Sequence, residues 1–249
     1  MEQIKLAVIG AGSMGVKHAH LISSHDRCTL AGICDTNPSL RSVADKFGVR
    51  FYTSPEELIN KENPTGAIIA TPNSLHASLA EVCANQKVHM LIEKPVADTI
   101  ESAGNIVAIT RSMGVKVLVG HHRRHSPLVQ KVRELIREGS LGKLVGVSII
   151  WALLKPDEYF KTVWRSRKPG GGPLLINLIH ELDLVRFLCG EISEVYARKS
   201  SAIRGHEVED SLNISICFES GAFGTSLASD VSPSPWSYEL TTGENPLYY

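Results

Sequence analysis

The sequence lacks the features that mark several large classes of protein. Its 249 residues carry 26 basic and 26 acidic side chains, so no excess of one sign favours nucleic acid or an anionic membrane as a partner. No apolar run approaches the length that spans a bilayer, and no basic segment followed by an apolar core opens the chain. We therefore expect a soluble, cytoplasmic protein whose partners include neither nucleic acid nor a membrane.

Cysteine is scarce, odd in number and scattered. No two of the five cysteines stand in the C-x-x-C spacing that is typical of zinc sites and redox motifs. Buried thiols in a reducing compartment are therefore favoured over disulfides or zinc, and we expect no metal site. The five positions are Cys28, Cys34, Cys83, Cys189 and Cys217.

The first half of the chain alternates short apolar strands with helical segments. Such alternation predicts an α/β fold with a doubly wound parallel sheet of the Rossmann type, whose ligands lie at the carboxyl ends of the strands. The 43% of hydrophobic residues suffices for a substantial core. The expected strands are 6–9, 29–34, 67–70, 88–92 and 115–119, and the expected helices are 16–23, 39–47, one that begins at Ser54, 75–85, and one that Asp98 and Glu101 cap and that ends near Met113.

The pattern changes near residue 122, where strands begin to predominate. Helices are expected over 126–139 and 174–188, and the segments between them mix apolar and polar residues in alternation. The sequence therefore predicts a Rossmann domain, 1–122, followed by an α+β domain, 123–249, with an open, mainly antiparallel sheet. The expected strands of that sheet are 144–154, 195–200, 212–218, 222–228 and 238–242.

The stretch Gly10-Ala11-Gly12-Ser13-Met14-Gly15 follows the first strand and opens the first helix. In a dinucleotide site the first glycine permits a tight turn, the second lets a pyrophosphate approach the main chain, and the third lets the helix pack close to the strand. The free N–H groups and the positive end of the helix dipole then face the phosphates. Taken alone, this spacing indicates a structural turn about as strongly as it indicates a cofactor site.

Asp35 ends the second strand, 20 residues beyond Gly15. An acidic side chain at this place accepts hydrogen bonds from an adenosine ribose and repels a 2′-phosphate, so NAD is favoured over NADP. The alternative is that Asp35 only begins the turn Asp-Thr-Asn-Pro, since Asp and Asn are ordinary turn residues. The glycine turn at the correct distance favours the cofactor role.

Five stretches of the chain have an order and spacing that belong together. They are the glycine turn, Ala70-Thr71-Pro72-Asn73-Ser74-Leu75-His76, Glu93-Lys94-Pro95, Gly120-His121-His122-Arg123-Arg124, and Gly170-Gly171-Gly172 followed by His180-Glu181-Leu182-Asp183-Leu184. In these stretches the chain resembles the glucose-fructose oxidoreductase and inositol dehydrogenase family, also called Gfo/Idh/MocA. The resemblance implies a nicotinamide-binding domain, a sheet domain that carries a sugar, polyol or inositol substrate, and a longer chain than this one, as if its C-terminal strands were missing.

The resemblance also implies a catalytic role for Lys94. An ammonium at a strand end can hydrogen-bond the hydroxyl being oxidised and stabilise its developing negative charge. From the residue alone, a surface lysine paired with Glu93 is the favoured interpretation, and Pro95 is a candidate for a cis peptide. The expected cofactor is NAD, and the expected cofactor-binding residues are Gly10, Gly12, Ser13, Met14, Gly15, Asp35, Thr71, Pro72, Asn73, His76, Glu93 and Lys94.

His180 is the candidate general base, because imidazole titrates near neutral pH and can take the hydroxyl proton. Asp183 lies three residues on, where it can orient His180 or bind a substrate hydroxyl. The alternative is a capped core histidine beside a surface aspartate. One departure stands out: many members of the family carry an aspartate four residues before this histidine, and here Ile176 occupies that position and cannot accept a proton.

The run His121-His122-Arg123-Arg124-His125 invites a metal or nucleic-acid interpretation, but neighbouring residues point to opposite faces and the patch is short. Trp164 is expected to contact substrate or only to pack, since an aromatic face suits sugar C–H groups. Glycines before His180 are expected to let the loop pass close to a ligand. The expected substrate-binding residues are His122, Arg124, Trp164, Arg165, Asn177 and Asp183.

These expectations combine into one main hypothesis and one alternative. The main hypothesis is an NAD-dependent oxidoreductase that transfers hydride between the nicotinamide ring and a secondary hydroxyl of a sugar, polyol or inositol-like substrate. The alternative, motivated by Ile176 and the early C-terminus, is a non-catalytic or regulatory NAD(H)-binding protein of the same fold. A homodimer or homotetramer through the C-terminal sheet is expected by analogy with such folds.

Overall fold

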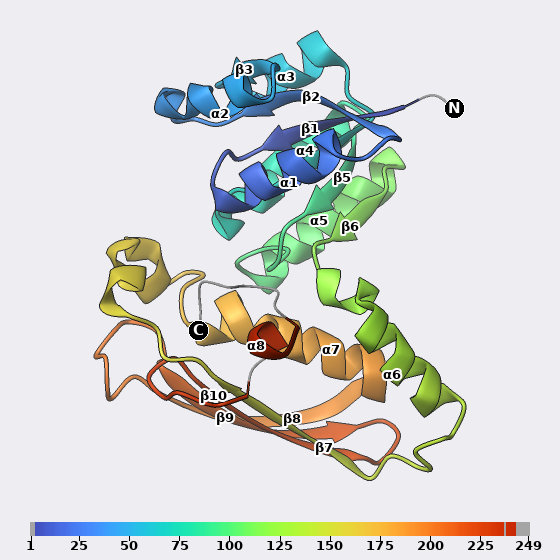
Figure 1. Cartoon of the computed structure of the whole chain (residues 1–249), viewed down its shortest axis with the longest axis vertical. Helices are drawn as coiled ribbons and strands as arrows, with labels where there is room; N and C mark the ends of the chain where they lie inside the picture. Colours follow the sequence, from blue (N-terminus) through green and yellow to red (C-terminus); the bar gives the residue numbers. More distant parts are fainter. Residues whose placement is uncertain (1–2, 237, 243–249) are drawn as a thin grey trace. The chain divides into compact units, whose positions relative to one another are not determined.

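The computed structural model describes residues 3–236 and 238–242. The chain divides into two compact units, Met1–Gly120 and His121–Tyr249, and each is described by itself. Figure 1 traces the helices and strands of both units in chain order. The glycine turn and Lys94 belong to the first unit, and His180 belongs to the second.

The first unit is built on a six-stranded sheet in the order β3-β2-β1-β4-β5-β6, in which every pairing is parallel. The predicted doubly wound parallel sheet is thus confirmed. The sequence does not predict β3, because three residues are too few to show a periodic pattern. The strands are β1 Ile4–Ile9, β2 Cys28–Cys34, β3 Arg50–Tyr52, β4 Gly66–Ile69, β5 His89–Ile92 and β6 Val117–Val119.

Helices connect these strands, and side-chain caps fix where two of them begin. Ser54 Oγ accepts a hydrogen bond from the Glu57 N–H at 3.1 Å, so α3 begins as predicted. At α5 the cap is Thr99 and not Asp98, because Asp98 lies one residue too early to reach the first turn, whereas Thr99 Oγ1 accepts from the Ser102 N–H at 3.1 Å. The helices are α1 Ser13–Ser23, α2 Arg41–Lys46, α3 Pro55–Glu62, α4 His76–Asn85 and α5 Ile100–Met113.

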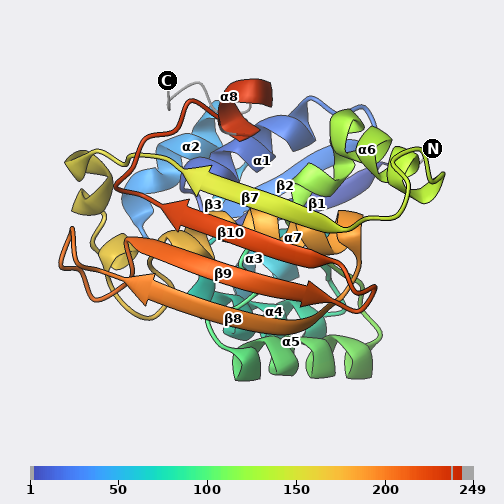
Figure 2. The same cartoon turned by 90° about the horizontal axis from the view of Figure 1, so that it is seen from below.

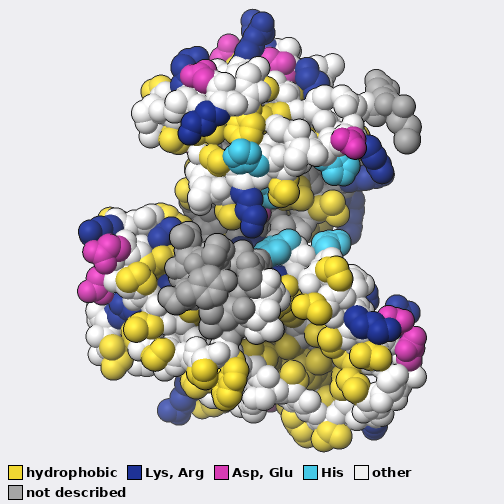
Figure 3. Space-filling model, in the orientation of Figure 1, with side chains coloured by type: hydrophobic (Ala, Val, Ile, Leu, Met, Phe, Trp, Pro, Cys, Tyr) yellow, Lys and Arg dark blue, Asp and Glu magenta, His cyan; other side chains and the backbone are white. Residues whose placement is uncertain are grey.

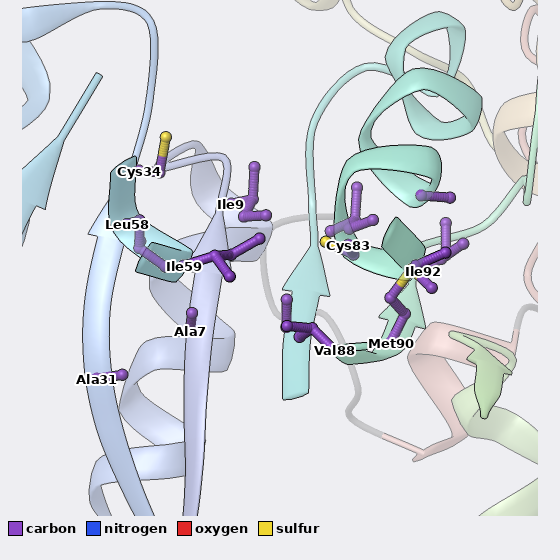
Figure 4. Close-up of a cluster of buried hydrophobic side chains, with 14 of the residues drawn as sticks. Ala7, Ile9, Ala31, Cys34, Leu58, Ile59, Cys83, Val88, Met90 and Ile92 are labelled. Carbon is purple, nitrogen blue, oxygen red and sulfur yellow. The ribbon is translucent and has the colours of Figure 1, made fainter. Parts of the chain in front are cut away.

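The core of the first unit lies on both faces of the sheet, between the strands and the helices that cover each face. Figure 4 shows side chains of β1, β2 and β5 with those of α3 and α4 in one buried cluster. Cys34 and Cys83 belong to this cluster, and burial raises the pKa of each thiol to about 12. All five cysteines are free, but Cys28, Cys189 and Cys217 are only partly buried, so the expectation of buried thiols holds for two of them.

The second unit is built on a four-stranded sheet in the order β7-β10-β9-β8. β9 pairs antiparallel with both neighbours and β10 runs parallel to β7, so the predicted mainly antiparallel sheet is confirmed. In Figure 2 the strands lie side by side in front of α7, which covers the opposite face. The strands are β7 Gly146–Ala152, β8 Ile192–Ser200, β9 Ser211–Phe218 and β10 Phe223–Ser229, and the longer helices are α6 Pro127–Arg137 and α7 Ile179–Cys189.

The predicted strand over 238–242 is wrong, because Tyr238–Thr242 forms the short helix α8. Thr242 Oγ1 donates to the Tyr238 carbonyl at 2.7 Å, and the Arg123 guanidinium stacks over the Tyr238 ring at 4.0 Å. These contacts outweigh the β-propensity of Thr and Tyr. Elsewhere, 3-10 turns occupy Pro38–Leu40, Asn73–Leu75, His122–His125, Asp157–Lys161 and Val163–Ser166, and a π-helix, Leu174–Leu178, leads into α7.

The described helices are too short or too polar for any of them to cross a bilayer. Figure 3 shows acidic and basic side chains close together at several places on one face of the molecule, as the equal numbers of the two lead one to expect. In the face that Figure 3 presents, charge of one sign is therefore not gathered into a continuous patch.

Candidate functional site

The carboxyl ends of five strands of the first unit form one row. The last residues of neighbouring strands pair with one another, and each following residue continues the ladder with one hydrogen bond. The Gly10 N–H donates to the Cys34 carbonyl at 2.7 Å, and the Glu93 N–H donates to the Ile69 carbonyl at 2.9 Å. The turns that begin at Gly10, Asp35, Ala70, Glu93 and Gly120 consequently leave the sheet along one edge.

The three glycines of the first turn have different surroundings. Gly10 has a φ of +102°, and a Cβ there would lie 2.6 Å from the Ala70 carbonyl oxygen. A Cβ on Gly15 would lie 1.8 Å from the Gly10 carbonyl oxygen, so only glycine lets α1 pack this closely. A Cβ on Gly12 would meet nothing within 4 Å. Gly10 and Gly15 are therefore required by the protein's own packing, whereas the space beside Gly12 is open to a ligand.

The amino end of α1 has the properties of an anion site. Gly12 takes the N-cap position with an extended backbone, and within residues 3–236 and 238–242 no side chain caps the helix there. Ser13 and Met14, which follow, are exposed. The first N–H groups and the positive end of the helix dipole are thus open to a negatively charged group.

Asp35 ties the glycine turn to the end of β2. Its Oδ2 accepts a hydrogen bond from the Ala11 N–H at 2.8 Å, and its Oδ1 accepts from the Asn37 N–H at 2.9 Å. The carboxylate therefore stands beside the glycine turn. Asp35 both begins the turn after β2 and lies next to the stretch expected to bind the cofactor, so the two interpretations are compatible. A carboxylate oxygen has more than one lone pair, so these bonds leave acceptor capacity for ribose hydroxyls.

The turn after β4 places its residues at different depths. Pro72 is exposed and Thr71 is partly buried, while Asn73 and His76 are buried. The His76 ring contacts two main-chain carbonyls, that of Thr71 through Nε2 at 2.9 Å and that of Pro95 through Nδ1 at 3.1 Å. Its side chain therefore holds turns together inside the unit and is not presented to a ligand.

Glu93 is buried at the end of β5 and pairs with His18 of α1, a contact that the sequence does not reveal. His18 Nε2 lies 2.7 Å from Glu93 Oε1, and the Lys94 N–H donates to Glu93 Oε2 at 3.2 Å. Burial raises the pKa of Glu93, but the hydrogen bond from His18 and the charges of His18 and Lys94 outweigh it and lower the pKa below its ordinary value. The carboxylate thus fixes the main chain of Lys94, whose peptide to Pro95 is cis.

In the second unit, His180 is the second residue of α7 and is 9% exposed. The exposed ring of His122 packs edge-on against it, with centroids 5.2 Å apart. Ile176 and Asn177 are partly buried in the π-helix before it, and π-turns are frequent at functional sites. The π-helix thus carries the apolar Ile176 at the position where many members of the family that the motifs resemble carry an aspartate.

The Asp183 carboxylate is held by Arg124, which the sequence analysis predicts to be a substrate-binding residue. Arg124 donates to the buried Asp183 carboxylate from Nε at 2.7 Å and from Nη2 at 2.5 Å, and His121 Nε2 lies 3.7 Å from Asp183 Oδ1. Beside this pair, the buried Arg123 donates to Glu181 Oε1 at 2.6 Å. Both ion pairs link the turn before α6 to α7, and the spacing of the sequence gives no signal for either.

Trp164 and Arg165 lie in the 3-10 turn Val163–Ser166. Trp164 is 42% exposed, whereas Arg165 Nη1 donates to the Tyr159 carbonyl at 2.9 Å and its guanidinium stacks on the Tyr159 ring. A Cβ on Gly171 would lie 2.5 Å from the Arg167 carbonyl oxygen, and one on Gly172 would lie 2.5 Å from a Glu209 carboxylate oxygen. Protein atoms crowd these glycines, so packing alone requires glycine at both positions.

Across residues 3–236 and 238–242, no three His, Cys, Asp or Glu side chains are gathered as a metal ion requires. His121 and His122 contact different partners, Asp183 and His180, so these two adjacent imidazoles do not converge on one point.

Two family models match the chain. One describes an oxidoreductase family with an NAD-binding Rossmann fold, Gfo/Idh/MocA, and matches residues 4–121. The other describes the C-terminal domain of the same family and matches residues 129–244. Together they cover both units and agree with the resemblance that the motifs carry.

Individual relatives are similar at moderate identity. A myo-inositol 2-dehydrogenase of Thermotoga maritima is 27% identical over 89% of this chain and 67% of its own length. A 2,7-anhydro-N-acetylneuraminate hydratase of Escherichia coli is 28% identical over 89% of this chain and 60% of its own length. The crystal structure of the WlbA dehydrogenase from Bordetella pertussis, in complex with NADH and UDP-GlcNAcA, superposes with a TM-score of 0.88 at 27% identity over 93% of this chain and 68% of that one. The chain spans about two thirds or less of the length of these two relatives.

Proposed function

Because the chain belongs to the Gfo/Idh/MocA oxidoreductase family, we propose that it transfers hydride between NAD and a secondary hydroxyl of a sugar, polyol or inositol-like substrate. The observation that carries this proposal is the row of strand ends in the first unit. Gly10, Asp35, Thr71 and Lys94 follow four different strands whose carboxyl ends lie in register along one edge. In open parallel sheets this edge is where ligands bind.

The residues of the first unit fit a dinucleotide. The space beside Gly12 and the uncapped start of α1 suit a pyrophosphate, and the Asp35 carboxylate suits ribose hydroxyls while it repels a 2′-phosphate. When bound, NAD supplies the carbon that accepts the hydride. Thr71 is partly buried and Pro72 is exposed at the next strand end, and both are proposed to contact the same ligand.

Lys94 is proposed to hold the reacting hydroxyl. Its ammonium donates a hydrogen bond to the substrate oxygen and stabilises negative charge as the proton leaves, which is the main electrostatic contribution available from this side chain. His180 is proposed to take that proton, since imidazole exchanges protons near neutral pH. Because Ile176 stands where many members of the family carry an aspartate, proton transfer is proposed to run through Lys94 and His180, without a carboxylate at that position.

The substrate class rests on the names of relatives. Two relatives are named for myo-inositol and D-apiose, and the similar WlbA structure is a complex with UDP-GlcNAcA, all of them polyhydroxylated. An exposed aromatic face such as that of Trp164 suits the C–H face of a sugar, and the bidentate Arg124–Asp183 pair and Asn177 offer polar groups. His122 and Arg165 complete the proposed substrate-binding set.

We further propose a cytoplasmic homodimer or homotetramer that assembles through the outer face of the β7-β10-β9-β8 sheet. Figure 2 shows this face uncovered by the described helices. It carries large apolar side chains, with Ile150 51%, Phe223 64% and Leu227 50% exposed. Apolar side chains on a broad sheet face are typical of an interface.

The proposal is tested with a panel of inositols, sugars, sugar acids and nucleotide sugars, each with NAD and NADP in parallel. Because one relative is named a hydratase, substrate conversion is followed by mass spectrometry as well as by NADH absorbance. We expect turnover with NAD, and a fall of about a hundredfold or more in kcat for Lys94→Met, since general acid–base groups contribute that much. Lys61→Met, at an exposed position of α3, is the control and keeps the parental rate.

Two outcomes would count against the proposal. A Lys94→Met variant within threefold of the parental kcat removes the assigned role of Lys94. NADH binding without conversion of any panel member would leave a regulatory cofactor-binding protein as the better description.

A further inference from the structure

His76 opens α4 and is 1% exposed, although it follows a turn at the ligand-facing edge of the sheet. Its Nε2 lies 2.9 Å from the Thr71 carbonyl oxygen, and its Nδ1 lies 3.1 Å from the Pro95 carbonyl oxygen. Thr71 belongs to the turn after β4, and Pro95 belongs to the turn after β5. One planar ring thus spans two neighbouring turns that leave adjacent strands.

Both partners of the ring are carbonyl oxygens, which only accept hydrogen bonds. A neutral imidazole donates from one nitrogen, and a ring with a proton on each nitrogen donates to both oxygens. When each nitrogen carries a proton, the ring fixes the separation of the two carbonyls, because its nitrogens are held apart by a rigid aromatic frame. Burial strengthens such bonds by removing competition from water.

We propose that His76 is a positioning residue, which sets the Lys94 turn against the Thr71-Pro72-Asn73 turn and so holds Lys94 in register with the cofactor. The proposal rests on the proposed function and deepens it. Direct contact of the His76 side chain with a cofactor is not its role, since the ring is buried and both nitrogens face the main chain.

The bond to Pro95 acts one peptide away from Lys94. On the other side of Lys94, its N–H donates to Glu93 Oε2 at 3.2 Å, and Glu93 is in turn held by His18. Hydrogen bonds therefore hold the main chain on both sides of Lys94, one to the Glu93 carboxylate before it and one from His76 to the Pro95 carbonyl after it. Loss of either bond lets the lysine side chain leave its productive position.

Two near-isosteric substitutions separate the two bonds. The amide nitrogen of Asn stands near the place of Nδ1 and that of Gln near the place of Nε2. His76→Asn therefore keeps a donor for Pro95, and His76→Gln keeps a donor for Thr71. Because residue 76 follows the Thr71 turn directly in the chain, the bond to Pro95 alone still ties that turn to the Lys94 turn, so we expect His76→Asn to keep kcat within about threefold. His76→Gln and His76→Ala lose the bond to Pro95 and should lower kcat about thirtyfold or more, because a displacement of 1 Å costs up to a hundredfold. KM for substrate should change far less than kcat.

A double-mutant cycle with Lys94→Ala distinguishes positioning from general damage. If His76 acts through Lys94, His76→Gln causes no further loss of kcat once Lys94 is removed. Losses that multiply in the double variant, or a His76→Gln enzyme as fast as His76→Asn, overturn the proposal.

A second readout does not depend on turnover. Hydrogen exchange followed by mass spectrometry should speed up in both 71–76 and 93–98 in His76→Ala, while Glu81→Gln, at an exposed position of α4, leaves both segments unchanged. Unchanged exchange in 93–98 contradicts the proposal. A parental chain that converts no substrate contradicts the proposed function alone, and the exchange result then decides the role of His76 by itself.

Discussion

At the scale of single residues, the Lys94 turn depends on a contact between the buried Glu93 carboxylate and the partly buried His18 ring of a distant segment. Glu93 is 8% exposed, and His18 stands 75 residues earlier in the chain. Removing one partner of a buried pair leaves an uncompensated group, which is more damaging than losing an exposed pair. The exposed pair of Lys131 and Glu134 provides the comparison.

We expect His18→Ala to lower the free energy of unfolding by about 3 kcal/mol, because the buried Glu93 carboxylate loses its partner. Lys131→Ala should leave the denaturation midpoint unchanged. Urea denaturation followed by circular dichroism measures both. Equal midpoints for His18→Ala and the parent would show that the pair contributes nothing.

The same pair predicts how stability depends on pH. The pKa of Glu93 is lower in the folded chain than its ordinary value of 4.5, so the folded state binds the proton less readily than the unfolded state. Its contribution is present above pH 4.5 and is lost as the pH falls through the folded pKa. The double variant His18→Ala with Glu93→Gln should therefore show a flatter fall in stability below pH 4.5 than the parent.

At the scale of elements, the β1–turn–α1 unit separates packing from binding. Gly15 is crowded by the Gly10 carbonyl, whereas Gly12 has open space and a φ of −69°, which alanine adopts without strain. Gly15→Ala should therefore destabilise the unit by about 3 kcal/mol or more through overpacking. Gly12→Ala should change stability by less than about 1 kcal/mol.

The two variants should separate again in cofactor binding. A methyl group on Gly12 occupies the space assigned to the pyrophosphate, so we expect about tenfold or weaker NADH affinity in a fluorescence titration of Gly12→Ala. An unchanged affinity would mean that the pyrophosphate does not pass beside Gly12.

Elements with a clear pattern were predictable, and the exceptions have physical causes. Strands and helices of the first unit follow from apolar runs and caps such as Ser54. The three residues of β3 and the five of α8 are too short for periodicity to decide, and α8 is decided by Thr242 and by Arg123 stacking on Tyr238.

Among the site residues, only the positions of those that belong to a recognisable sequence motif were predictable. The glycine turn and Lys94 stand at strand ends as expected, because the order of apolar runs fixes where strands finish. The buried role of His76, the His18–Glu93 pair and the Arg124–Asp183 pair depend on contacts between segments far apart in the sequence, for which one chain gives no signal.

At the scale of the whole molecule, the proposed assembly surface is the outer face of the β7-β10-β9-β8 sheet of the second unit. Leu227 lies beside Ile150 of β7 and Asn213 of β9 in the sheet register. A charge at the centre of an apolar contact between copies is costly to desolvate. Leu227→Arg should therefore give a monomer by light scattering at concentrations where the parent is a dimer or tetramer.

The control is Ile203→Arg. Ile203 is 74% exposed and lies in the segment between β8 and β9, outside the strands of the sheet. It should keep the parental mass. NADH affinity should be the same in both variants, since neither lies in the first unit. A parent that is already monomeric would remove the proposed assembly.

The open amino end of α1 has a thermodynamic consequence. Helices normally satisfy their first N–H groups with a side-chain cap, and in the described chain Gly12 supplies none. A bound dinucleotide completes that helix, so occupancy and folding become linked: at a hundred times Kd, a ligand that binds only the folded state adds about 2.7 kcal/mol. The abundance of the protein in a cell would then follow the supply of its cofactor.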